Sequence, residues 1–88
     1  MKRYYAHYTF IYPDIFLKNV VVELNSDATI SGYFPFIHEL SGTEYHSGVQ
    51  IFIPFDLIGK VSIGDICKTE SRLKGLSDMD FLIRGFSV

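Results

Sequence analysis

The first extended segment of the chain places the tightest limit on its fold. From Arg3 to Tyr12, large apolar residues recur at every second position. This period of two is that of a β-strand, whose side chains alternate between its faces, and a helix would scatter the same rings around its circumference. One face of the predicted strand carries Tyr4, Ala6, Tyr8, Phe10 and Tyr12, and the other carries Tyr5, His7, Thr9 and Ile11.

The aromatic content extends this expectation to the whole chain. Aromatic residues make up 16% of the 88 residues, with six tyrosines, eight phenylalanines and no tryptophan. Rings favour pleated, half-buried surfaces and supply much of the buried area in a small domain. Apolar residues at 48% and charged residues at 20% are typical of a globular chain, and the length predicts a single domain over residues 1–88.

Further strands follow in the first two thirds of the sequence. The polar turn Asn25–Ala28 lies between two alternating runs and predicts a hairpin. Pro35 ends the second run, and residues 36–44 are expected to form a connection. After the break at Pro13-Asp14, the predicted strands are Phe16–Asn25, Thr29–Phe34, a short strand over Thr43–His46, and Gly48–Ile53, which Pro54 ends.

The last third is less regular. Lys60–Ile63 has strand character, and Met79–Val88 returns to alternation as a closing strand. Residues 65–74 favour one short helix, with Ser62 or Asp65 as the N-cap and Gly75 as the stop, and a hairpin through the same residues is the alternative. We therefore expect a mostly-β domain, a small β-sandwich or a barrel-like pair of antiparallel sheets with six to eight short strands and one short helix.

Charge and cysteine usage exclude several partners. The formal net charge is −2, and the densest basic run, Lys68 to Lys74, is interrupted by Glu70, so no cationic footprint for nucleic acid is predicted. No apolar run approaches the length that spans a bilayer. The single cysteine, Cys67, excludes an internal disulfide, and no secretory leader is indicated, so we expect a cytoplasmic protein.

Reactive groups are few, and their spacing fits no known motif. His7, His38 and His46 lie on separate segments, and a zinc site needs three or four converging ligands. No local motif around Cys67 supplies the base and the lowered thiol pKa that a nucleophile needs, and Gly59-Lys60 lacks the upstream glycine of a phosphate-binding loop. We therefore predict no catalytic residue, no cofactor and no metal site. The pairs Glu44 with Asp56 and Asp78 with Asp80 likewise have no acid–base spacing.

One resemblance to a known family follows from the order of the early segments. An aromatic strand and a Pro-Asp break precede Leu17–Leu24, a polar turn, Thr29–Gly32 and then Glu44–Val49 with its Gly-Val pair. This order, over roughly residues 4–53, resembles the β lead-in of the amidohydrolase superfamily of metal-dependent hydrolases. In that family the lead-in belongs to a small β-sandwich beside a catalytic barrel.

The chain departs from the family where the chemistry would begin. The family's Gly-Val strand leads to a His-x-His metal pair, whereas Ile53–Asp56 follows here, and no histidine occurs after His46. A barrel needs about 250 residues, and only the 34 residues after Pro54 remain. The resemblance therefore implies the sandwich without the enzyme, with Met79–Val88 as its returning strand.

The sequence predicts a non-catalytic structural or protein-interaction module. Its aromatic residues exceed what one small core hides, so Tyr5, His7 and their neighbours are expected to pack on a second copy, as a homodimer, or on a larger protein partner. Two alternatives remain. A small-ligand binding domain would show an apolar pocket with a few converging polar groups, and a metal-dependent enzyme would bring His7, His38 and His46 into one coordination sphere.

Overall fold

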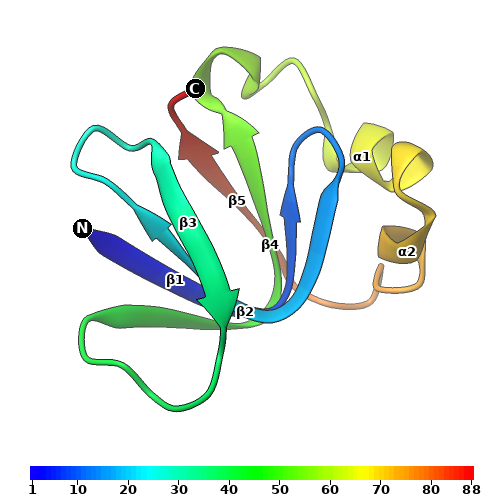
Figure 1. Cartoon of the computed structure of the whole chain (residues 1–88). Helices are drawn as coiled ribbons and strands as arrows, with labels where there is room; N and C mark the ends of the chain where they lie inside the picture. The colour runs from blue at the N-terminus through cyan, green and yellow to red at the C-terminus, as the bar shows by residue number, and fades with distance from the viewer.

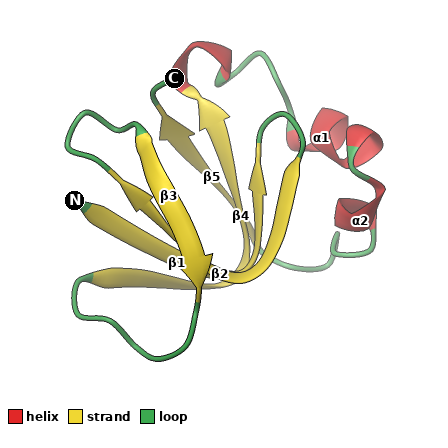
Figure 2. Ribbon diagram, viewed as in Figure 1, coloured by secondary structure: helices red, strands yellow, loops and turns green.

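Five strands form one sheet in a computed structural model that describes the whole chain, residues 1–88 (Figures 1 and 2). The order across the sheet is β3-β2-β1-β4-β5, and the helices lie between β4 and β5 in the chain. The elements are β1 Lys2–Ile11, β2 Ile15–Leu24, β3 Ile30–Pro35, β4 Thr43–Pro54, the 3-10 helix η1 Phe55–Leu57, α1 Ile63–Thr69, α2 Ser71–Lys74 and β5 Phe81–Phe86.

The mostly-β expectation is confirmed, and the arrangement of the strands differs in two respects. The chain has five strands, not six to eight, and they form a single mixed sheet, not a pair of antiparallel sheets. β2 is antiparallel to β1 and to β3, whereas β4 runs parallel to both β1 and β5. Parallel pairs need long crossovers. The crossover from β1 to β4 consists of β2, β3 and the segment after β3, and the crossover from β4 to β5 is the helical segment.

The sheet curls until its two outer strands approach each other at one end. Ser87, just after β5, donates its backbone N–H to the carbonyl of Ala28, just before β3, at 2.9 Å. Thr29 and Ser87 form an isolated parallel bridge at the same point. The curl therefore makes the single sheet barrel-like, and Figure 1 shows β3 and β5 converging near the C-terminus.

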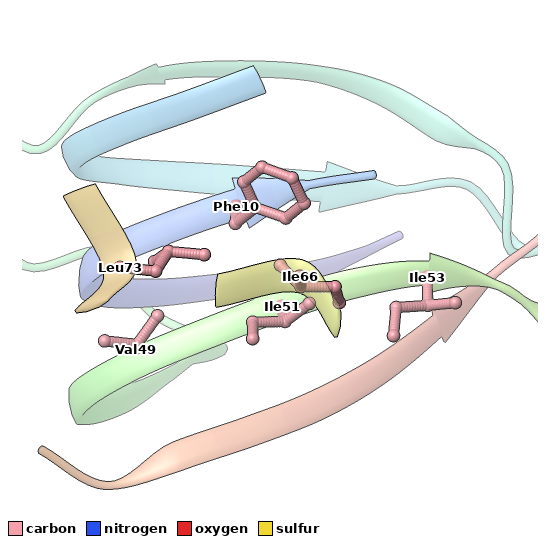
Figure 3. Close-up of a cluster of buried hydrophobic side chains, with 6 residues drawn as sticks. All are labelled: Phe10, Val49, Ile51, Ile53, Ile66 and Leu73. Atoms are coloured by element: carbon pink, nitrogen blue, oxygen red, sulfur yellow. The ribbon is translucent and has the colours of Figure 1, made fainter. Parts of the chain in front are cut away.

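Two apolar clusters occupy opposite faces of the sheet. Phe10, Val49, Ile51 and Ile53 face α1 and α2, whose Ile66 and Leu73 complete the first cluster (Figure 3). The second cluster fills the inside of the curl and consists of Ile11, Val20, Val22, Leu24, Phe52 and Phe86. Both faces of β4 are thus covered, which is why Val49–Pro54 is buried throughout and, apart from Gln50, is apolar.

A bend across three strands changes the predicted faces. Ala6 pairs with His46 and Tyr8 with Val49, so Ser47 and Gly48 of β4 together lie opposite His7. On β2, Asn19 has a positive φ of 53° at the same level. A bulge of this kind reverses the side-chain alternation. Tyr4 therefore packs with the second cluster, whereas Tyr8, Phe10 and Tyr12 belong to the first. The prediction that these rings share one face of the strand is wrong.

Helical structure in the last third is confirmed, but it consists of two short helices, not one, and of the two N-caps that the sequence left open Ser62 is the one used. Ser62 is the N-cap of α1: its hydroxyl accepts the backbone N–H of Asp65 at 3.1 Å, and the Asp65 carboxylate accepts the N–H of Ser62 at 3.2 Å. This capping box satisfies two backbone donors that a helix start leaves unpaired. Glu70 interrupts the helix and caps α2, which ends at Gly75. The predicted strand Lys60–Ile63 is wrong, because Val61 forms only one bridge, to Ile58.

Acid should loosen this helical segment before the sheet. Hydrogen bonds from Ser62 lower the pKa of Asp65, and those from Arg72 lower the pKa of Glu70. Their stabilisation is therefore present above the ordinary carboxyl pKa near 4 and is lost as pH falls through the lower folded values. We expect the ¹³Cα helical shifts of residues 63–74 to shrink between pH 5 and 2.5 while those of the strands persist.

An Asp65→Asn substitution tests the cause of this pH dependence. Because asparagine cannot ionise, the helical shifts of α1 should already be reduced at pH 6 and should change less on acidification. Asp78→Asn, an exposed acid outside both helices, is the control and should behave as the unsubstituted chain. Helical shifts that stay constant down to pH 2.5 in the unsubstituted chain would show that the capping carboxylates do not hold this segment.

Candidate functional site

The three histidines do not converge on one metal site. His7 is exposed at the bend of β1, and His38 is exposed in the connection between β3 and β4. His46 is largely covered, with its side chain 14% exposed, and its Nε2 lies 3.0 Å from the carbonyl oxygen of Asp80. No group of three or more His, Cys, Asp or Glu side chains is placed to hold a metal ion. His46 has a structural task, which is to tie β4 to the entry of β5.

Cys67 lies on α1 at the edge of the first cluster. Its half-buried thiol lines a shallow hollow of about 230 Å³ with Ile63, Ser77, Met79 and Phe81. No histidine or lysine lines this hollow to act as a base or to favour the thiolate. The side chain therefore serves as a small apolar residue against the sheet.

The remaining polar candidates are engaged in local structure. Gly59 has a φ of 88° in the turn after η1, a conformation that favours glycine. The carbonyl of Asp80 accepts the backbone N–H of Val49 at 2.8 Å. A hollow of about 200 Å³ between the β1–β2 turn and α1 contains Asp65, whose carboxylate is already held in the capping box. None of these groups forms an acid–base pair.

An aromatic surface forms where the β3–β4 connection crosses the sheet. We use this name for Tyr5, Phe36 and Tyr45 with the flanking His7 and with Ile37, the exposed residue that follows Phe36 in the chain. The Tyr5 ring lies 4.6 Å from the ring of Phe36 and 5.6 Å from that of Tyr45, and Phe36 meets Tyr45 edge-on at 6.0 Å. The ring of His7 lies 6.1 Å from that of Tyr5. β1, the β3–β4 connection and β4 thus contribute rings to one cluster. The rings meet in edge-on and tilted arrangements, which aromatic side chains prefer.

Hydrogen bonds fix the aromatic surface from below. The Tyr5 hydroxyl donates to Oδ1 of Asn19 at 2.9 Å, and Phe36 donates its backbone N–H to the Asn19 carbonyl at 2.8 Å. The Tyr45 hydroxyl accepts the backbone N–H of Leu40 at 3.1 Å. The rings are therefore held in place before any partner arrives, which keeps the entropic cost of binding low.

Part of this surface remains open to solvent. Tyr45 is 46% exposed and Ile37 is 83% exposed, while Tyr5 and Phe36 are half-buried. On the same face of β1 and β2, Arg3 and Glu23 form an ion pair at 2.8 Å, so the charged pair bordering the rings is internally neutralised. The sequence analysis expected Tyr5 and His7 to lie at a protein contact, and the structure places the rings of Phe36 and Tyr45, from segments distant in the chain, beside Tyr5.

A buried network of polar side chains inside the curl was not predicted from the sequence. Gln50 is fully buried, and its amide Nε2 donates to the Thr9 hydroxyl at 3.0 Å and to the Tyr4 carbonyl at 3.2 Å. Its Oε1 accepts Nε of Arg84 at 3.0 Å. The signal was present in the sequence, since Gln50 is the one polar residue inside the apolar run Val49–Ile53.

Arg84 links this network of polar side chains to the protein surface. Its guanidinium lies over the Tyr4 ring at 4.0 Å from the ring centre, and Nη1 donates to Glu44 at 3.3 Å. Burial lowers the pKa of Arg84, and the charge of Glu44 opposes that shift. Every polar atom of the Gln50 amide has a hydrogen-bond partner. Buried polar networks whose groups are all hydrogen-bonded favour a single packing arrangement of the core.

No helix in the structure is both long enough and apolar enough to cross a membrane. Comparisons of the chain with protein-family models, with curated proteins and with solved structures found no match.

Proposed function

We propose that this chain is a non-catalytic protein-interaction module that self-associates through its aromatic surface. The observation that carries the proposal is the pair of open apolar side chains, Tyr45 at 46% and Ile37 at 83% exposure, on a cluster of rings that is already rigid. Tyrosine and large apolar anchors dominate the binding energy of protein interfaces, and they cost little entropy when they are held in place beforehand.

A second copy of the chain is the partner we propose. A two-fold interface brings one surface against itself, so any net charge on it would be repelled. The rings here are bordered by the internally neutralised pair Arg3–Glu23, which removes one source of that repulsion. The larger protein partner anticipated from the sequence is the second form of the same proposal, and it would use the same rings.

The resemblance to the amidohydrolase lead-in enters the proposal as a hypothesis of origin. What supports it is that its two carrying segments are present as a β2–β3 hairpin and as a strand that runs on from the Gly48-Val49 pair. On this proposal the likeness is confined to the β lead-in of that family, and the protein acts in the cytoplasm, where its unpaired Cys67 stays reduced.

Sedimentation equilibrium tests the self-association. We expect a monomer–dimer equilibrium at micromolar to high-micromolar concentrations. The double variant Tyr45→Ser with Ile37→Ser should weaken dimerisation at least tenfold, because it removes apolar side chains that the dimer interface would bury. Tyr33→Ser is the matched control, since Tyr33 is also 46% exposed but lies on β3 outside the aromatic surface. Its dimerisation should be unchanged. A monomer at millimolar concentration, or an equal effect of Tyr33→Ser, would contradict the proposal.

A further inference from the structure

A second opening lies at the end of the curl where β3 and β5 converge. It is a cleft of about 420 Å³ between the start of β1, the β2–β3 turn and η1. Clefts of roughly 300–1,000 Å³ hold small molecules, and the mouths of barrel-like sheets are among their usual places. Its lining includes Lys2, Tyr4, Leu24, Ser26, Phe55 and Gly85.

The fold holds the walls of this cleft in place. The hydrogen bond from Ser87 to Ala28 ties the β2–β3 turn, which lines the cleft, to the end of β5. Phe55 lies directly on Gly85, where a Cβ atom would collide with its ring. The opposite wall, Tyr4, is fixed by the guanidinium of Arg84 on its face and by the edge of Phe52, with ring centres 6.3 Å apart. The rings of Tyr4 and Phe55 therefore form two fixed walls of the cleft.

The exposure of Phe55 is the first observation that points to a ligand. Phe55 remains 56% exposed although it lies beside buried residues of β4, and it lines both this cleft and a neighbouring hollow of about 310 Å³. An exposed ring between two hollows offers apolar area to a bound molecule. Leu24 and Tyr4 offer apolar area from the other side.

The charges of the two hollows differ in sign. Lys2 supplies the one charged side chain that lines the larger cleft, with the hydroxyl of Ser26 as a nearby donor. Asp56 supplies the charged side chain of the smaller hollow. A ligand with a negative group is therefore attracted to the Lys2 side and repelled from the Asp56 side.

We propose that this cleft binds a small amphipathic anion, with an aromatic or short aliphatic body between Tyr4, Leu24 and Phe55 and a carboxylate or similar group at Lys2. The site is separate from the aromatic surface, so the two proposals stand or fall independently. The volume of the cleft restricts the ligand to a small molecule.

Titration with 2-naphthoate, followed by ¹⁵N-resolved NMR, tests the site on untagged protein. We expect shifts confined to the backbone amides of residues 2–4, 24–28, 55 and 85, with a micromolar to millimolar Kd. The neutral analogue 2-naphthalenemethanol should bind several-fold more weakly. Lys2→Gln should reduce naphthoate affinity up to about fivefold, as expected for an exposed charge pair, whereas Lys60→Gln should leave it unchanged.

Phe55→Ala should abolish the response, and its ¹⁵N spectrum will show whether the sheet is intact. Since Lys2 is exposed, Lys2→Gln keeps the proposal testable even if loss of the Phe55 ring perturbs the fold. Absence of shifts at millimolar naphthoate, shifts that map to Tyr45 and Ile37, or equal binding of the alcohol and the acid would overturn the proposal.

Discussion

Gly48→Ala is expected to destabilise the protein by about 3 kcal/mol, close to the upper end for overpacking of a closed site. A Cβ at position 48 would collide with the backbone carbonyl of Asp80, and a backbone has no alternative rotamer with which to move aside. The collision would also break the hydrogen bond from Val49 to that carbonyl and displace the ring nitrogen of His46. For a chain of this size such a loss lowers Tm by about 15 °C.

Thermal unfolding followed by far-ultraviolet circular dichroism measures this effect. Gly32→Ala on β3 is the matched control, because nothing lies within 4 Å of a Cβ built there and its φ is not positive. That control should change the unfolding free energy by no more than about 1 kcal/mol. Equal Tm values for the two variants would show that β4 does not approach the entry of β5 as closely as described.

Arg84→Ala should cost about 3 kcal/mol, because its loss leaves Oε1 of the fully buried Gln50 without a donor. The substitution also removes the cation from the face of Tyr4 and leaves a void inside the curl. Urea denaturation should show a lower midpoint. The Glu44 carboxylate, which is mostly exposed, adds little to this cost.

Arg72→Ala provides a closely matched comparison. Arg72 also pairs with a glutamate, at 2.7 Å, and also lies over an aromatic ring, that of Phe16 at 4.5 Å, but it is exposed. Solvent screens such a pair, so the urea midpoint of Arg72→Ala should remain nearly unchanged. If the two arginine variants unfold at the same urea concentration, the polar chain of Gln50 and Arg84 does not contribute to the core as described.

Local patterns in the sequence were sufficient to place most elements. The hairpin around Asn25–Ala28 and the helix start at Ser62 depend on turn and capping residues that act on their immediate neighbours. The face of each residue was harder to predict. In a regular strand Tyr4 and Tyr8 would lie on the same face, but the bulge opposite His7 places them on opposite faces. The bulge arises from the pairing of β1 with β4, which are distant in the sequence.

The candidate sites show the same division between local and long-range information. Tyr5 and His7 were anticipated because they are neighbours on one strand. Phe36 and Tyr45 join them only through the crossover that makes β4 parallel to β1, and that crossover leaves no local signature. Gly48 depends on the same long-range information: the Gly-Val pair is visible in the sequence, but the steric need for glycine comes from the backbone of Asp80.

The most direct test of the interaction proposal is an isotope-filtered NOE experiment on an equal mixture of ¹³C-labelled and unlabelled chains. Such a spectrum detects only protons that lie close together across two molecules. We expect intermolecular cross-peaks between the side chains of Tyr45, Ile37 and Phe36. A dimer whose cross-peaks arise from Tyr33 or Phe55 instead, or a concentrated sample with no intermolecular cross-peak, would contradict the assignment of the aromatic surface as the site of self-association.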